Sequence, residues 1–302
     1  MLKKQLYFFV SIILFSSCNF NKMFLQPDKL PSTLKQIKMR RSGKDSLVMI
    51  FSGSNFQPAI IKNRKDTVDS GFTIESVVFK SKSGNKLNGW FLTPKNIKAP
   101  ITLLHLHGNS GSIVNQFGAV APLIKNGFQI FVFDYSGFGF SEGKATRKNV
   151  LIDALSAVDY LKERNEVKGT KFVLYGQSLG GNLSAVVAAQ RQDIIDGLVI
   201  EGGFSSHGDI AAHFVKKAIL FGFIGRIAVK PGYNSKKAIK KNKKPLLVIH
   251  STEDKIVPFF MGTKIYEKAN SPKEFYEIQK CHICGPYFYT DSISKKIIRM
   301  VR

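Results

Sequence analysis

The stretch KFVLYGQSLGGNLSAVVAAQ, residues 171–190, decides the fold, because it joins an apolar strand to a small-residue helix through a glycine-rich turn. The turn reads Gly-Gln-Ser-Leu-Gly at 176–180, the G-x-S-x-G pattern that places a serine on a sharp bend with its oxygen exposed above a sheet. Glycines are expected on both sides, since a side chain there would collide with the neighbouring strand and helix. The stretch therefore predicts that Ser178 is a nucleophile at a strand end.

Strand and helix patterns alternate on both sides of this turn. Further strand-like runs lie at 74–80, 83–94, 101–107, 128–134, 194–202, 245–251 and 273–279, and helical patterns such as 146–164 separate most of them. Nearly continuous apolar strands joined by helices predict an α/β protein with a mostly parallel, eight-stranded sheet and helices on both faces. The first two strands form a hairpin, so we expect an antiparallel edge.

The residues that follow the strands carry the candidate chemistry, because ligands of such sheets bind beyond the carboxyl ends of the strands. Asp254 follows the strand at 245–251, and His282 follows the strand at 273–279. Ser178 would attack a carbonyl, His282 would take and return the proton, and Asp254 would orient the imidazole. The backbone N–H groups of Leu179 and Asn109 would form the oxyanion hole.

Two other strand-end residues compete for these roles. His107 ends the strand at 101–107, where we expect it to shape the oxyanion loop by hydrogen bonding rather than to act as the base. Glu201 also follows a strand and could in principle replace Asp254 as the acid.

His282 sits between two cysteines in QKCHICGPYF, residues 279–288, so other chemistry has to be weighed. A zinc site needs about four ligands, whereas Cys281, His282 and Cys284 offer three. A redox C-x-x-C motif belongs to a different fold. These alternatives stay open, but the triad base is favoured, and Cys281 and Cys284 could equally well form a local disulfide or stay reduced.

The motifs together resemble those of α/β-hydrolases of the small-cap esterase and acyl-hydrolase branch, from Ile74 to the C-terminus. The resemblance rests on GNKLNGWF, HLHGNSG, DYSGFGFSEG, YGQSLGG, EGGFSS, YNSKKAI and HSTEDKIVP, together with His282. It implies a cap insertion at 207–244, a serine mechanism, and no cofactor or metal. The chain departs from the family pattern at Lys280 and Cys281, where a glycine usually precedes the histidine.

The N-terminus has the layout of an export signal. Two lysines precede an apolar run from Leu6 to Phe15, which is shorter than the about 20 residues needed to span a bilayer. Ser16-Ser17-Cys18 resembles a bacterial lipobox, so residues 1–18 are expected to be a lipoprotein signal. An ordinary cleaved signal peptide or an uncleaved anchor is the alternative. Residues 19–65 are expected to form a tether and irregular edge segment, and 66–302 the hydrolase domain.

The chain is strongly basic, with 45 Lys and Arg against 21 Asp and Glu and a net charge of +24. Ten of the basic residues lie between Ile210 and Lys244 in the expected cap, which has no acidic residue there. We expect an envelope lipoprotein whose basic residues contact anionic lipid, and no nucleic-acid partner, because no nucleic-acid motif is present. A solvated basic face is the alternative.

Three functions are compatible with these features. The favoured one is hydrolysis of small or medium carboxylic esters or thioesters through an acyl-enzyme on Ser178. The second is amide or peptide hydrolysis by the same triad, since a fold does not settle the substrate. The third is a non-catalytic, membrane-anchored binding protein. The presence of Ser178, Asp254 and His282 argues against this third function.

Overall fold

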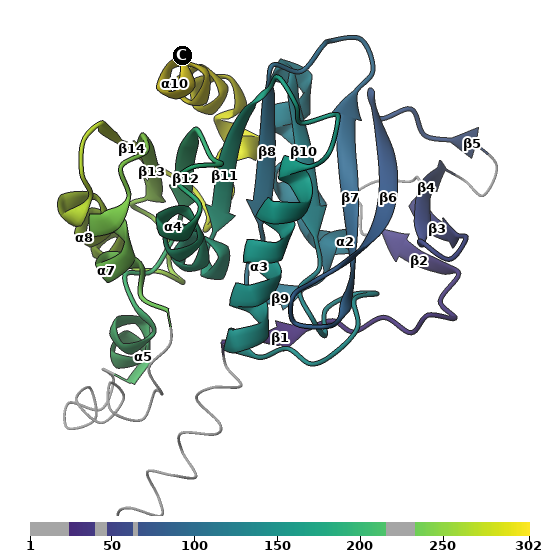
Figure 1. Ribbon diagram of the computed structural model, residues 1–302, viewed down its shortest axis with the longest axis horizontal. Coiled ribbons are helices and arrows are strands. Elements are labelled where there is room, and N and C mark those ends of the chain that lie inside the picture. The colour runs from purple at the N-terminus through teal and green to yellow at the C-terminus, as the bar shows by residue number, and fades with distance from the viewer. Residues whose placement is uncertain (1–23, 40–46, 63–65, 216–232) are drawn as a thin grey trace, which may run out of the picture.

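The computed structural model describes residues 24–39, 47–62, 66–215 and 233–302 (Figure 1). The expected signal with Cys18 and residues 216–232 of the expected cap lie outside the described residues. Within the described residues, no helix combines the length and the apolar character needed to cross a bilayer.

The core is an eight-stranded sheet in the order β14-β13-β12-β11-β8-β10-β7-β6. Neighbours from β14 to β10 pair in parallel, whereas β7 is antiparallel to both β10 and β6, which confirms the mostly parallel sheet with an antiparallel edge. The strands are β6 (Phe72–Lys80), β7 (Lys86–Pro94), β8 (Ile101–Leu106), β10 (Phe128–Phe133), β11 (Lys171–Gln177), β12 (Gly197–Glu201), β13 (Leu246–Ser251) and β14 (Lys273–Ile278).

Helices cover both faces of this sheet (Figure 1). One face packs against α3 (Arg147–Lys162), α4 (Leu179–Gln190), α7 (Ser235–Ala238), η3 (Ile239–Lys241) and α8 (Phe259–Lys268). The other packs against α2 (Ile113–Gln116), η1 (Phe117–Ala119), η2 (Ala121–Asn126) and α10 (Thr290–Val301). In β11, Leu174 belongs to the first apolar cluster and Val173 and Tyr175 to the second, because successive strand residues point to opposite faces.

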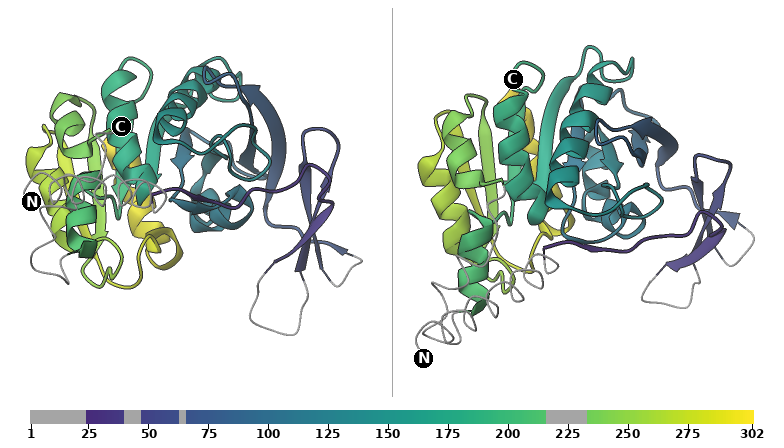
Figure 2. Two further views of the ribbon diagram at one scale, coloured as in Figure 1. Left: turned by 90° about the horizontal axis from the view of Figure 1, so that it is seen from below. Right: turned by 60° about the horizontal axis from the view of Figure 1, so that its bottom comes forward.

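The N-terminal region differs from the irregular edge structure expected there. The strands β2 (Gln36–Met39), β3 (Leu47–Ser52), β4 (Gln57–Lys62) and β5 (Asp66–Thr67) form an antiparallel sheet that projects from the side of the main sheet (Figure 2). Met49 and Phe51 are buried, and Phe56 stacks on Phe140 with 4.1 Å between ring centroids. These strands are only two to six residues long, and β3 (LVMIFS) is an almost unbroken apolar run without strand alternation, so the pattern does not predict this small sheet.

The segment before this sheet passes the loop that follows β8. Its strand β1 (Gln26–Pro27) pairs in parallel with β9 (Ser110–Gly111), which directly follows the loop after β8. We call residues 24–30 the N-terminal strap.

The start of α4 is pressed against the backbone of β8. A Cβ added to Gly180 would lie 1.8 Å from the Leu106 carbonyl oxygen, and one added to Gly176 would lie 2.3 Å from the Gly180 oxygen. Backbone cannot yield as a flexible side chain can, so both positions require glycine. The collision predicted for the glycines around Ser178 is therefore confirmed.

Replacing Gly180 by Ala should lower the free energy of unfolding by about 1–3 kcal/mol or more, because the methyl group would force α4 away from β8. Gly118→Ala is the matched control, since nothing lies within 4 Å of a Cβ there. Urea denaturation of both variants measures the difference. Equal stability of the two variants would contradict the close packing of α4.

Candidate active site

Ser178 occupies the sharp turn between β11 and α4. Its backbone angles are φ 55° and ψ −113°, a conformation that residues with a side chain rarely adopt. The Ser178 N–H donates to the Glu201 carbonyl oxygen at 3.0 Å, which ties the turn to the end of β12. Strain of this kind costs about 1–3 kcal/mol and persists where surrounding structure enforces it.

Asp254 and His282 come together from the ends of β13 and β14. His282 Nδ1 donates to Asp254 Oδ2 at 2.6 Å, and Asp254 Oδ1 accepts the backbone N–H groups of Ile256 and Val257 at 2.8 Å each. Burial acts to raise the pKa of Asp254. The hydrogen bond from His282, the positive charge that His282 carries when protonated, and the two backbone N–H groups all lower this pKa, and together they hold it below its ordinary value. Asp254 is thus an ionised acceptor, and Nε2 of His282 is the nitrogen left to take a proton.

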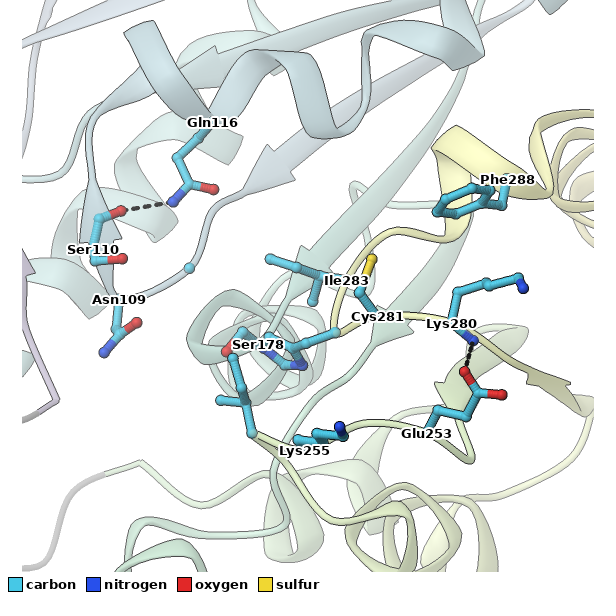
Figure 3. Close-up of a pocket in the computed structure, with 13 residues that line it drawn as sticks. Asn109, Ser110, Gln116, Ser178, Glu253, Lys255, Lys280, Cys281, Ile283 and Phe288 are labelled. Atoms are coloured by element: carbon cyan, nitrogen blue, oxygen red, sulfur yellow. Dashed lines mark hydrogen bonds between the residues drawn. The ribbon is translucent and has the colours of Figure 1, made fainter. Parts of the chain in front are cut away.

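Ser178 and His282 line the same pocket, which has a volume of about 770 Å³. In Figure 3, Ser178 lies between Asn109 and Ser110 on one side and Lys280 and Glu253 on the other. The structure therefore gathers the nucleophile candidate, the histidine and the oxyanion loop around one cavity at the carboxyl ends of the strands.

His250 supports the acid, a role that sequence reasoning missed. Its Nε2 donates to the Val257 carbonyl oxygen at 2.9 Å and lies 3.6 Å from Asp254 Oδ2. Burial lowers the pKa of His250, so the ring is neutral near pH 7 and holds the turn that binds Asp254 without adding charge. The signal was available, because His250 belongs to the same HSTED motif as Asp254.

Glu201, the rival acid, makes different contacts. Its Oε2 accepts from the Tyr175 hydroxyl at 2.8 Å and from Gln177 Nε2 at 2.7 Å, and its Oε1 accepts from the Gly285 N–H at 2.7 Å. These are its side-chain hydrogen bonds within the described residues, and none goes to His282. Burial raises the pKa of Glu201. Glu201 thus anchors the loop that carries His282 to the centre of the sheet.

The loop around His282 is also stiffened covalently. Cys281 and Cys284 form a disulfide with Cα atoms 5.6 Å apart, so neither offers a free thiolate to a metal. Lys280 has φ 84°, the left-handed conformation that the usual glycine adopts readily. The Lys280 N–H donates to Glu253 Oε2 at 3.0 Å and its carbonyl oxygen accepts from Ser251 Oγ at 2.5 Å, so local contacts hold the lysine in the conformation of the missing glycine.

The expected oxyanion loop lies beside Ser178. Leu179 begins α4, and the Asn109 carbonyl oxygen accepts the Gln26 N–H of the N-terminal strap at 2.7 Å. His107 is buried beneath this loop, where its Nδ1 donates to the Gly108 carbonyl oxygen at 2.8 Å, and its ring lies 4.2 Å from that of Tyr135. Burial lowers its pKa to about 3. These contacts agree with a loop-shaping role for His107.

Asp134 completes the buried layer under the loop. Its Oδ1 accepts the Ile113 N–H at 2.8 Å and lies 3.9 Å from His107 Nε2. Burial raises the pKa of Asp134 from 3.8 to about 8, so both members of the pair are neutral near pH 7. The oxyanion loop therefore rests on an uncharged layer.

This raised pKa predicts a pH dependence of stability. The neutral Asp134 carboxyl makes its full contribution to the free energy of unfolding below pH 3.8. This contribution is lost as the pH rises towards about 8, because over that range the carboxyl is ionised in the unfolded chain but still protonated in the folded one. The unfolding free energy of the wild type should therefore fall relative to Asp134→Asn between pH 5 and 8, by at most about 1.4 kcal/mol per pH unit. Urea titrations at several pH values measure this difference, and a difference independent of pH would contradict it.

Comparison with known proteins places the chain in a family. A profile of the alpha/beta hydrolase fold matches residues 101–218. The chain is 32% identical over 207 residues to the uncharacterized protein YfhR of Escherichia coli O157:H7, which covers 67% of this chain and 70% of YfhR. The chain belongs to the α/β-hydrolase family.

Two further likenesses are informative. The uncharacterized membrane protein YNL320W of Saccharomyces cerevisiae is 29% identical over 226 residues, which covers 72% of this chain and 76% of that protein. The Pyrococcus furiosus esterase Pf2001 superposes with a TM-score of 0.63 at 19% identity, covering 76% of this chain and 90% of the esterase. The structural likeness confirms the α/β-hydrolase fold.

Proposed function

We propose that the protein is a serine hydrolase that cleaves carboxylic esters or thioesters. The observation that carries this proposal is the 2.6 Å hydrogen bond from His282 to the ionised Asp254, in a pocket that Ser178 also lines. A histidine held at Nδ1 by a carboxylate presents its other nitrogen to a nucleophile, which is the arrangement of a serine triad.

The reaction follows from these positions. Ser178 Oγ forms a bond to the substrate carbonyl carbon while His282 Nε2 takes the hydroxyl proton. The tetrahedral oxyanion accepts hydrogen bonds from the backbone N–H groups of Leu179 and Asn109. When the bond from carbon to the leaving oxygen or sulfur breaks, His282 returns the proton to the leaving group. Water then gives a proton to His282 as its oxygen bonds to the acyl carbon. The bond from that carbon to Ser178 Oγ breaks, His282 returns the proton to Ser178 Oγ, and the acid is released.

The wider organisation of the chain supports an enzyme of the cell envelope. Residues 1–18 would be a lipoprotein signal with Cys18 lipidated, and 66–302 the hydrolase domain with a small cap at 207–244. Within the described part of this cap, α5 (His207–Val215) is linked to α7 by a salt bridge between Asp209 and Lys236 at 2.6 Å. The basic residues of the chain would favour an anionic membrane surface.

Substitution of Ser178 and Asp254 tests the proposal. With p-nitrophenyl acetate and butyrate, kcat should fall by about 10⁶ in Ser178→Ala and by about 10⁴ in Asp254→Asn, whose amide would leave the histidine in the wrong tautomer. Glu201→Gln compares the two acids: it should lower kcat far less than Asp254→Asn, because Glu201 binds the loop that carries His282 and not the imidazole itself.

Three outcomes would count against the proposal. Full activity in Ser178→Ala would remove the nucleophile. Loss of turnover in Glu201→Gln with turnover kept in Asp254→Asn would exchange the acid. Faster hydrolysis of an anilide or peptide than of the matched ester would favour an amidase instead.

A further inference from the structure

The space around Ser178 has two parts that meet at the nucleophile. The pocket described above contains His282, Lys255 and Lys280 and is wide. A second, smaller cavity of about 70 Å³ also reaches Ser178, and we call it the apolar lobe; it is lined by Phe24, Leu179, Phe204, Ile210, Phe214 and Val257, among others. Asn109, Ser178 and Ile256 line both, so a scissile carbonyl at Ser178 would send one substituent into each part.

The position of the histidine decides which substituent goes where. His282 must protonate the leaving group, and it lines the wide pocket but not the apolar lobe. Leu179, the expected oxyanion donor, lines the apolar lobe. The leaving group therefore belongs in the wide pocket and the acyl group in the apolar lobe.

One wall of the apolar lobe comes from the far end of the sequence. Phe24 begins the N-terminal strap and is only 6% exposed. Its ring meets that of His207 edge-on, with 4.8 Å between centroids, and lies 6.5 Å from that of Phe204. Phe24 thus fills the space between α5 and the loop after β12.

The strap is held in register by backbone hydrogen bonds rather than by Phe24 itself. The Gln26 N–H donates to the Asn109 carbonyl oxygen at 2.7 Å, and the Asp28 N–H donates to the Gly111 oxygen at 3.0 Å. Farther along, the Leu30 N–H donates to the Gly139 oxygen at 2.9 Å. Both views in Figure 2 show the purple N-terminal segment passing the end of the main sheet before it reaches the small sheet.

We propose that the substrate carries an apolar acyl group that occupies this lobe, and that Phe24 is a specificity-determining residue that limits its length. This inference rests on the proposed ester hydrolysis. The strap would also fix the Asn109 loop, so the residues that shape the acyl site and the oxyanion site come from one segment.

A chain-length series tests the role of Phe24. Removing the ring in Phe24→Ala enlarges the lobe, so the ratio of kcat/KM for p-nitrophenyl octanoate to that for the acetate should rise by about tenfold or more, since a single methylene can be worth 10–200-fold. Leu30→Ala is the matched control. Leu30 is 7% exposed on the same strap but packs in the cluster behind the sheet, so its loss should lower stability and leave the ratio unchanged.

The outcomes separate the two proposals. Phe24 would be only a packing residue if Phe24→Ala changed kcat/KM equally for every chain length. The same would follow if Leu30→Ala shifted the ratio of octanoate to acetate hydrolysis as much as Phe24→Ala does. Calorimetry of octanoate binding to full-length Ser178→Ala protein probes the lobe without turnover. The affinity for octanoate should change when Phe24→Ala is added to this variant. If the wild type hydrolyses no ester while this Phe24-dependent binding is seen, the proposed function fails and the acyl lobe stands.

Discussion

The contact between the first turn of α4 and the carbonyl of Leu106 is the constraint on which the rest of the site depends. Because Gly180 has no Cβ, α4 can begin directly against β8, and the chain must then turn sharply out of β11. The turn forces Ser178 into its strained conformation beside the loop that follows β8. Close packing of one helix on one strand thus brings a nucleophile candidate and an oxyanion candidate together.

The loop with His282 needs a different solution, because it follows an edge strand of the sheet. Asp254 binds it at His282, Glu253 and Ser251 bind it at Lys280, and Glu201 binds it at Gly285. The disulfide between Cys281 and Cys284 stiffens the loop from within. Supporting contacts of this kind hold a reactive side chain close to its working geometry. The neutral His250 and the neutral layer of His107 and Asp134 add support without competing charges.

Most of the main sheet could be predicted from sequence, because apolar strands alternating with helices leave a strong periodic signal. The pairing of Asp254 with His282 was also accessible, since both follow strands whose ends meet at one edge. The four-stranded N-terminal sheet was not, because its short strands depend on tertiary packing of a few residues such as Met49 and Phe51. Phe24 was missed for a related reason: nothing local in the sequence links it to a turn more than 150 residues away.

The central claim is that Ser178 is activated by His282, and covalent labelling tests it most directly. Intact-protein mass spectrometry after treatment with a fluorophosphonate probe would compare the wild type with Ser178→Ala and His282→Ala. The account predicts one probe on the wild type, attached to Ser178, none on Ser178→Ala, and far slower labelling of His282→Ala. Folded wild-type protein that takes up no probe, or labels equally fast without His282, would contradict it.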